Sequence, residues 1–346
     1  MQYQTLPQLD EKVSKICLGT MTWGQQNDET QAHEQMDMAL SEGVNFWDTA
    51  EMYPSPPDKD KQGDTERFMG TWFHKTKQRD KVVLASKISP MDFLRDGQTR
   101  FNATHISSAI DGNLERLQTD YIDIYQLHWP ERQTNYFSQL GYTEAMAAQP
   151  LDNLTPFLET IQALNDEIKK GRIRAYGLSN DTAWGLMRYL WEADKNGLIA
   201  PITVQNPYSL LNRSYEVAMA EIAHRENVGL LAYSPLGFGV LSGKYLDGKR
   251  PTGARLTMYD RFARYTNEEA LSATVQYAKI AADAGLDMAQ MALAFVNSRF
   301  FVISNIIGAT TTEQLKSNID SIHLTLNSDI LAAIEAVHTQ QPNPSP

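Results

Sequence analysis

Short apolar segments recur along the chain, and each is bounded by Gly, Asp, Asn or Pro. Their apolar residues are nearly continuous rather than alternating, which is typical of parallel strands that are buried on both faces. The pattern therefore predicts eight strands. They are Ile16–Gly19, Phe46–Thr49, Val82–Ser86, Ile122–Leu127, Ile173–Gly177, Thr203–Asn206, Gly229–Ser234 and Val302–Gly308.

Between these segments, apolar residues recur at the three- and four-residue spacing of an amphipathic helix. The helix predicted over Thr30–Glu42 ends at Gly43, a residue suited to the left-handed position that follows a helix. The same pattern predicts further helices between later strands. They are Thr104–Leu117, Asp181–Lys195, Glu216–Glu226 and Glu268–Ala284.

Eight strands that alternate with helices favour an α/β fold of the (β/α)₈ TIM-barrel type over an open sheet. The intervals after the fourth and seventh strands are longer than a βα unit needs, so they predict long loops there. We expect a single barrel domain over residues 1–346. Residues 1–15 are expected to form a hairpin that closes the bottom of the barrel, and the proline-rich residues 340–346 a loose tail.

The composition narrows the range of possible binding partners. The chain has 42 acidic and 31 basic residues and a net charge of −11, which repels nucleic acid and anionic membranes. No apolar run approaches the ~20 residues that span a bilayer. Cys17 is the single cysteine and the N-terminus has no signal-like pattern, so we expect a cytoplasmic location. The histidines lack metal-ligand spacing, which predicts no metal site. The pattern favours no particular oligomeric state.

Polar residues gather where three neighbouring strands are predicted to end. Asp48, Lys87 and His128 follow the second, third and fourth strands, and Tyr53 lies five residues beyond Asp48. The carboxyl ends of barrel strands share one face, where catalytic groups collect. Each residue alone has a structural explanation, such as a helix cap for Asp48. Four on consecutive strands favour chemistry.

These residue types suit the reduction of a carbonyl group. A hydride that arrives at the carbonyl carbon leaves an alkoxide, which must be protonated. Tyrosine is a poor acid at neutral pH, but a nearby ammonium such as that of Lys87 favours its phenolate, and Asp48 can anchor that ammonium. A neutral His128 can hydrogen-bond the carbonyl oxygen. The sequence therefore predicts Tyr53 as the proton donor.

The stretches that carry these residues resemble the active-site motifs of the aldo-keto reductases. The resemblance runs in order along essentially the whole chain, and the sequence is also similar to the potassium-channel β-subunit branch of that family. It implies that Tyr53 donates the proton, that Lys87 and Asp48 adjust its acidity and that His128 orients the substrate. The matching stretches are Asp48–Tyr53, Ala85–Lys87, Leu127–Pro130, Gly177–Asn180, Gln205–Tyr208, Ala232–Gly237 and Ile307–Leu315.

The resemblance also implies NADP, in its reduced form NADPH, as the cofactor. Ser179, Asn180 and Gln205 would hold the nicotinamide carboxamide, and Tyr233 would stack on the ring. The pyrophosphate path would be lined by Ser234, Leu236, Gly237, Gly239 and Lys244. The adenosine 2′-phosphate end would fall to Gly308, Thr310, Thr312, Gln314 and Asn318. Further expected cofactor contacts are Gly19, Thr20, Met21, Asp48, Pro235, Phe238, Val240, Leu241, Ser242, Gly243 and Arg255.

The segment Gly308–Thr312 fits this role from its own residues, because it links the last predicted strand to a helix whose first N–H groups can receive phosphate. The alternative is that its threonines serve only as a helix cap. Many family members place a cation directly on the 2′-phosphate. Here Lys316 and hydroxyl groups are available, with Arg255, Arg261 and Arg264 in the preceding insertion, and NADP remains favoured over NAD.

Three functions follow. The first is an NADPH-dependent reductase of small aldehydes or ketones, with the insertion over residues 131–152 walling the substrate pocket through Phe137 and Tyr142. The second is an NADP(H)-binding regulatory subunit that senses redox state with little turnover, as the channel branch suggests. The third is an aldolase with Lys87 as a Schiff-base lysine, which Asp48 opposes by keeping the amine charged.

Overall fold

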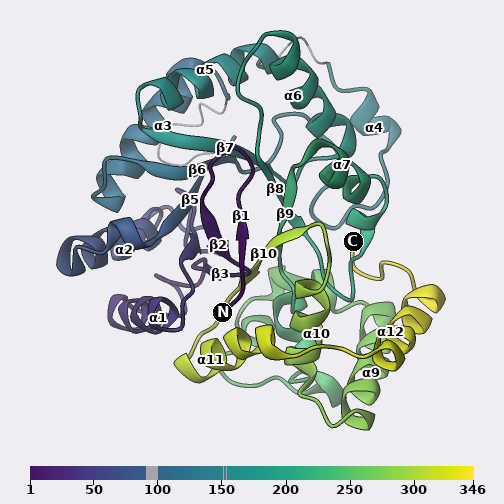
Figure 1. The fold of residues 1–346 in the computed structure, drawn as a ribbon. Coiled ribbons are helices and arrows are strands. Elements are labelled where there is room, and N and C mark those ends of the chain that lie inside the picture. The colour runs from purple at the N-terminus through teal and green to yellow at the C-terminus, as the bar shows by residue number, and fades with distance from the viewer. Residues whose placement is uncertain (91–99, 151, 153) are drawn as a thin grey trace.

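The computed structural model describes residues 1–90, 100–150, 152 and 154–346, apart from the side chain of Arg261. Eight parallel strands close into a barrel in the order β10-β3-β4-β5-β6-β7-β8-β9, with helices around it (Figure 1). The predicted (β/α)₈ fold is confirmed. The barrel strands are β3 Ile16–Gly19, β4 Phe46–Asp48, β5 Val83–Ile88, β6 Ile122–Leu127, β7 Ile173–Ser179, β8 Thr203–Pro207, β9 Gly229–Tyr233 and β10 Val302–Ile307.

Helices cover the outside of the barrel, and several begin at a side chain that caps the first turn. Asn102, Thr182 and Asn267 each accept a hydrogen bond from a backbone N–H three residues on. The longer helices are α1 Glu29–Ser41, α2 Asp64–Thr76, α3 Ala103–Leu117, α5 Phe157–Lys169, α6 Ala183–Lys195, α7 Met219–Glu226, α9 Glu268–Asp283, α10 Met288–Asn297, α11 Thr312–Asp320 and α12 Ser328–Gln340. Short helical turns are α4 Glu144–Ala147, α8 Arg255–Met258, η1 Arg79–Lys81, η2 Ser214–Glu216, η3 Gly237–Ser242, η4 Leu246–Gly248, η5 Asp260–Tyr265 and η6 Ser321–His323.

The N-terminal residues form a hairpin in which β1, Tyr3–Thr5, pairs antiparallel with β2, Lys12–Ser14. Leu6 and Val13 belong to the same buried apolar cluster as Cys17 and Phe46 inside the barrel. Figure 1 shows β1 and β2 lying across the barrel opening. The hairpin thus covers the end at which the strands begin, which leaves the opposite end for chemistry.

The C-terminal tail differs from the loose segment expected over residues 340–346. The Ser345 N–H donates to the Leu211 carbonyl at 3.0 Å, and Asn343 Oδ1 accepts from the Arg213 N–H at 2.6 Å. Asn267 Nδ2 donates to the Pro344 carbonyl at 2.8 Å. Proline removes backbone donors, but carbonyls and side chains remain to bond, and here they dock the tail beside α9.

The long connections predicted after the fourth and seventh barrel strands lie at the open end of the barrel. The first runs from His128 to α5 and contains α4. The second runs from Ser234 to α9 and contains η3, η4, α8 and η5. Arg264 Nε of the second donates to Ser138 Oγ of the first at 3.0 Å, so the two connections touch. Among the described residues, no helix is long and apolar enough to span a membrane.

Candidate active site

Asp48 and Lys87 form an ion pair inside the barrel. Asp48 ends β4, and Lys87 lies within β5 rather than after it as predicted. Lys87 Nζ is 2.6 Å from Asp48 Oδ2 and donates to the Thr49 carbonyl at 2.7 Å. The side chains are 3% and 0% exposed, so neither charge has water as an alternative partner.

Two amides occupy the other oxygen of Asp48. Gln126 Nε2 on β6 donates to Asp48 Oδ1 at 3.0 Å, and Gln205 Nε2 on β8 donates to it at 2.7 Å. Gln205 Nε2 also donates to Gln126 Oε1 at 3.1 Å. Both carboxylate oxygens are therefore engaged. Sequence reasoning missed Gln126, because one polar residue inside a buried strand gives no signal until the strands are placed together.

Tyr53 lies over the Lys87 ammonium, with Nζ 4.9 Å from the centre of its ring. Burial raises the pKa of the Tyr53 phenol, and the positive charge of Lys87 opposes that rise. Burial by itself would lower the pKa of Lys87, but Asp48 and Tyr53 raise it above the ordinary value. Lys87 is thus held as an ammonium, which cannot attack a carbonyl, and the aldolase hypothesis loses its nucleophile.

His128 follows β6 and faces Tyr53, with ring centres 5.8 Å apart. Burial, followed by the charge of Lys87, lowers the pKa of His128 well below its ordinary value. The imidazole is therefore neutral at pH 7. Its Nδ1 lies 3.2 Å from Ser89 Oγ. A neutral ring can donate one hydrogen bond into the space before Tyr53.

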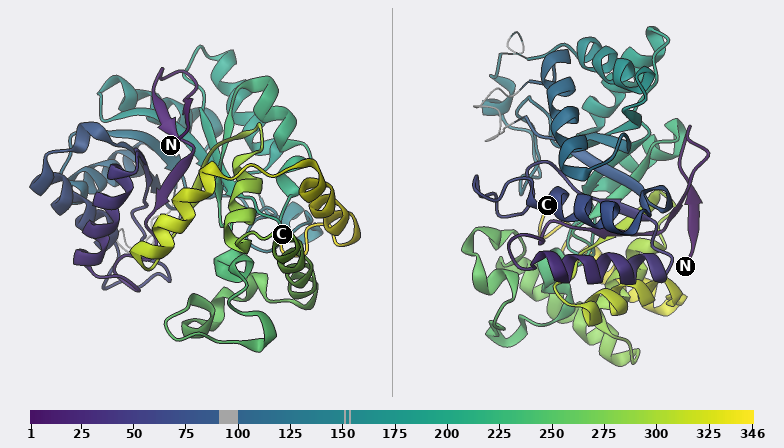
Figure 2. Two further views of the ribbon diagram at one scale, coloured as in Figure 1. Left: turned by 60° about the horizontal axis from the view of Figure 1, so that its bottom comes forward. Right: turned by 90° about the vertical axis from the view of Figure 1, so that its left-hand side faces the viewer.

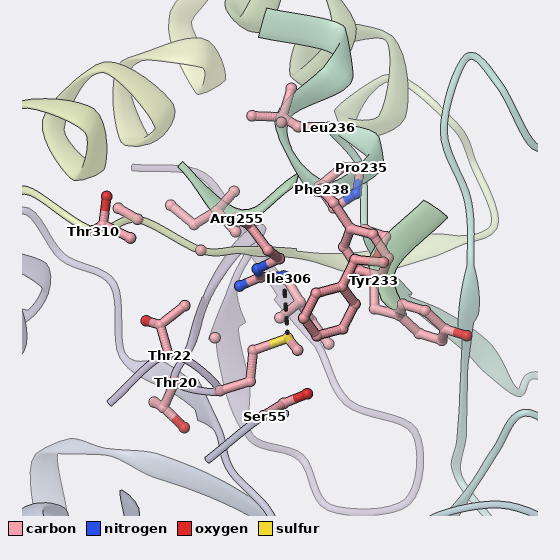
Figure 3. Close-up of a pocket in the computed structure, with 18 of the residues that line it drawn as sticks. Thr20, Thr22, Ser55, Tyr233, Pro235, Leu236, Phe238, Arg255, Ile306 and Thr310 are labelled. Atoms are coloured by element: carbon pink, nitrogen blue, oxygen red, sulfur yellow. Dashed lines mark hydrogen bonds between the residues drawn. The ribbon is translucent and has the colours of Figure 1, made fainter. Parts of the chain in front are cut away.

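A cavity of about 930 Å³ opens above these residues, between the ends of the barrel strands and the second connection. Figure 3 shows residues from both sides of it. Most of the residues predicted for the site line it. They are Gly19, Thr20, Met21, Asp48, Tyr53, His128, Asn180, Gln205, Tyr233, Ser234, Pro235, Leu236, Phe238, Gly239, Ser242, Lys244, Arg255, Gly308, Thr310, Gln314 and Asn318.

Other residues predicted for the cofactor do not line the cavity. Ser179 Oγ instead donates to the Gln205 carbonyl at 2.9 Å, which holds β7 against β8. Thr312 lies one position inside α11, whose cap is Thr311. Val240 and Leu241 of η3 pack into the core instead, and Gly237 and Gly243 do not line the cavity either.

Lys244 and Arg255 are cations of the cavity wall, and among the described residues neither forms an ion pair with a carboxylate. Arg255 Nη1 instead contacts Met21 Sδ at 3.7 Å, the dashed line in Figure 3, and its guanidinium lies 5.3 Å from the ring of Phe238. Burial lowers the pKa of both cations, and Arg255 adds to the effect on Lys244. Such a pair favours an anion between them.

The far end of the cavity is a tightly bonded loop before α11. Asn27 Nδ2 donates to the Thr310 carbonyl at 2.9 Å, and Asn318 Nδ2 donates to the Gly308 carbonyl at 3.2 Å. Lys316, expected to be available here, is instead 2.5 Å from Asp320 and 3.8 Å from Glu42, outside the cavity lining. Its place on α11 turns it away from the loop.

Several cavity residues were not predicted from sequence. Phe137 and Ser138 reach the cavity from the first connection, as expected of residues 131–152, whereas Tyr142 is 61% exposed and does not line it. The loops after β3 and β4 supply Thr22, Gln26, Met52, Ser55 and Pro57, whose only signal was their position beside predicted residues. Phe262 of η5, Asp287 before α10 and Ser317 of α11 also line the cavity.

The model of the aldo/keto reductase family matches residues 15–339. The chain therefore belongs to the aldo/keto reductase family, which confirms the resemblance, and it is an NADP-dependent oxidoreductase. It is 49% identical to Protein tas of Escherichia coli (strain K12) over 350 residues, with 100% of both chains covered. It is 32% identical to the uncharacterized oxidoreductase YrpG of Bacillus subtilis (strain 168), over 97% of this chain and 96% of that one.

A third similarity connects the chain to channel subunits. It is 29% identical to a probable voltage-gated potassium channel subunit beta of Oryza sativa subsp. japonica, over 99% of this chain and 98% of that one. This likeness is weaker than that to Protein tas but nearly as complete along the chain. It keeps two functional interpretations of the same barrel in view.

Proposed function

We propose that the protein is an NADPH-dependent carbonyl reductase in which Tyr53 protonates the oxygen of an aldehyde or ketone. The observation that carries the proposal is the contact of Tyr53 with the buried Lys87–Asp48 pair, at the base of the cavity and 5.8 Å from His128 between ring centres. A phenol beside a permanent ammonium is a proton donor whose conjugate base is stabilised.

The cavity suits NADP(H). Lys244 and Arg255 are cations without a carboxylate partner among the described residues, and the cofactor's phosphates supply the negative charge that such a pair lacks. The loop Gly308–Thr310 precedes the N-terminus of α11, where a phosphate is favoured. When bound, the reduced nicotinamide supplies the hydride.

The chain's own groups then handle the proton and the substrate. The neutral His128 donates a hydrogen bond to the carbonyl oxygen and so fixes the carbonyl before Tyr53. The Tyr53 hydroxyl gives up its proton to that oxygen as negative charge develops there. The Lys87 ammonium stabilises the phenolate that remains, and Asp48, held by Gln126 and Gln205, keeps Lys87 in place.

The experiment is an aldehyde turnover assay after NADPH binding has been measured by fluorescence titration. We expect saturable NADPH binding and steady oxidation of NADPH with aromatic aldehydes. Binding without measurable turnover across an aldehyde and ketone panel would refute the reductase.

The likeness to a channel subunit beta supports a second candidate, a regulatory subunit that binds NADP(H) and reports its redox state to a partner. The two functions differ in rate rather than in cofactor binding. Tight binding of NADPH with at most one slow turnover per bound cofactor would favour the regulatory subunit, and repeated turnover would favour the reductase.

A further inference from the structure

Arg264 reaches the cavity from η5, and the groups that hold it among the described residues are neutral. Its Nε donates to Ser138 Oγ at 3.0 Å, and its guanidinium carbon lies 5.6 Å from the ring centre of Phe137 and 5.8 Å from that of Tyr265. The side chain is half-buried and lines the cavity. It is thus a positioned cation rather than a free surface arginine.

No carboxylate among the described residues pairs with Arg264, in a chain with 42 acidic residues for 31 basic ones. Other half-buried arginines are paired. Arg79 lies 2.9 Å from Asp123, and Arg116 lies 2.7 Å from Glu66. The carboxylates of the cavity lining are already engaged, because Asp48 binds Lys87 and Asp287 caps α10. The charge of Arg264 is therefore left for something that enters the cavity.

Arg264 is also separate from the cations assigned to the phosphates. Arg255 packs against Phe238 and contacts Met21, whereas Arg264 packs against Phe137. The ring of Phe137 lies 6.0 Å from Trp129, and that of Trp129 lies 4.9 Å from His128. This row of rings leads from Arg264 to the group that holds the carbonyl.

A second path of contacts connects the same two points. The Tyr233 hydroxyl donates to Asn180 Oδ1 at 2.6 Å, and Asn180 Nδ2 donates to the His128 carbonyl at 2.8 Å. Tyr233 and Arg264 also lie close enough for the charge of Arg264 to act on the Tyr233 phenol. Arg264 therefore marks the outer end of the space whose inner end is formed by Tyr53 and His128.

We propose that Arg264, together with Ser138, binds a carboxylate at the far end of the substrate, so that the preferred substrates are aldehydes or ketones that carry a distal carboxylate. The terminal nitrogens of a guanidinium match the two oxygens of a carboxylate. Ser138 Oγ accepts from Nε, which leaves its O–H free to donate to the same group. This substrate class rests on the proposed reductase function.

The test compares matched substrates that differ only in charge. 4-Formylbenzoate and 4-formylbenzamide have the same shape, and a shorter pair is succinic semialdehyde and its amide. In at least one of the two pairs, we expect the wild-type enzyme to have a higher kcat/KM for the acid than for its amide. Arg264→Met should raise the KM for that acid about tenfold or more, as loss of a charge-assisted bond implies, and leave the amide unchanged.

Arg250→Met is the matched control. Arg250 lies in the same connection, is 61% exposed and does not line the cavity, so its loss removes one positive charge without touching the site. It should change neither substrate. Compared with Arg264→Met, Arg264→Lys should recover part of the preference for the acid, because lysine restores the positive charge but not the two parallel N–H donors of a guanidinium. Ser138→Ala keeps the charge of Arg264 and should raise the KM for the acid by a smaller factor than Arg264→Met does.

Binding without turnover separates this proposal from the reductase itself. Calorimetry of 4-formylbenzoate with the enzyme saturated in NADP⁺ should show weaker binding to Arg264→Met than to the wild-type enzyme. If turnover is absent but this difference holds, the reductase function fails and the carboxylate site stands. Equal loss of acid and amide, an unchanged preference, or a weakened NADPH affinity in Arg264→Met would overturn the carboxylate site.

Discussion

Lys87 Nζ lies 2.6 Å from Asp48 Oδ2 with no exposed surface on the lysine side chain, which makes this pair the electrostatic centre of the barrel. Removing one partner leaves the other charge buried without a counter-charge, at a typical cost of about 3–5 kcal/mol. Reading activity from either single variant therefore needs a stability measurement beside it.

Lys87→Met is expected to lower aldehyde turnover severely, and Asp48→Asn more mildly. Without Lys87 the buried Tyr53 phenol loses the main charge that opposes the rise in its pKa, and only the smaller effect of Arg255 remains. In Asp48→Asn the ammonium keeps its bond to the Thr49 carbonyl. Steady-state kinetics rank the variants, and urea unfolding monitored by circular dichroism checks the fold. The double variant should be more stable than Lys87→Met alone. The opposite activity order would contradict the role given to Lys87.

The cofactor prediction is that NADPH binds more tightly than NADH. The extra phosphate would meet the loop Gly308–Thr310 and the cavity cations, and each charge-assisted bond contributes about 1.5–3 kcal/mol. Fluorescence titration with each nucleotide measures the difference. Lys244→Met and Arg255→Met should weaken the binding of both nucleotides. Lys316→Met should weaken the binding of neither, because Lys316 pairs with Asp320. Equal dissociation constants for the two nucleotides would remove the basis of the preference.

The barrel could be predicted from sequence because every strand had a continuous apolar run, whereas α2, α5, α10 and α12 were missed. Of these, α2 and α5 begin without a side-chain cap, after Gly63 and Pro156. In the sequence, Gly70 also argues against a helix over these residues, because glycine has a low helix propensity. It is there for packing, since a Cβ at Gly70 would lie 2.2 Å from the Arg116 carbonyl oxygen of α3. Such an approach exists only once both helices are in place.

The cluster of Asp48, Tyr53, Lys87 and His128 was predictable because strand ends in a barrel converge by geometry alone. Gln126 was not assigned to the site, and Arg264 was offered only as a cation for the 2′-phosphate. One sits inside a strand, and the other reaches the cavity only because its connection folds back onto Ser138. The expectation that Lys316 is available to the cofactor is not supported for the converse reason. Its neighbours in sequence line the cavity, but its own side chain pairs with Asp320 outside the lining.

The substrate pocket should respond to Phe137 and not to Tyr142. Phe137 lines the cavity and contacts the Trp129 ring, whereas Tyr142 is 61% exposed and lies outside the lining. Phe137→Ala is expected to reorder the kcat/KM values of an aldehyde panel and leave NADPH affinity alone. Tyr142→Ala is the matched aromatic control from the same connection. An unchanged order in Phe137→Ala would show that the connection does not wall the pocket.

His128 should make the protein less stable in acid. Burial lowers its pKa in the folded state well below 6.5. Below pH 6.5 the His128 imidazole is therefore protonated in the unfolded chain but remains neutral in the folded chain. Stability falls with decreasing pH by up to about 1.4 kcal/mol per unit from this residue. His128→Gln should flatten that fall, as measured by urea unfolding at pH 8 and pH 5. Parallel losses in both proteins would show that His128 titrates normally when folded.

Tyr53→Phe tests the mechanism directly, because it removes one hydroxyl and keeps the ring that packs over Lys87. The volume hardly changes, so the fold should survive, and NADPH should still bind because Lys244 and Arg255 are untouched. Turnover should fall by at least the ~10²–10⁴ that positioned acid catalysis contributes. Single-turnover oxidation of bound NADPH by an aldehyde measures this without interference from product release. If Tyr53→Phe retains most of the wild-type rate, Tyr53 is not the proton donor, and the regulatory subunit becomes the better account of the site.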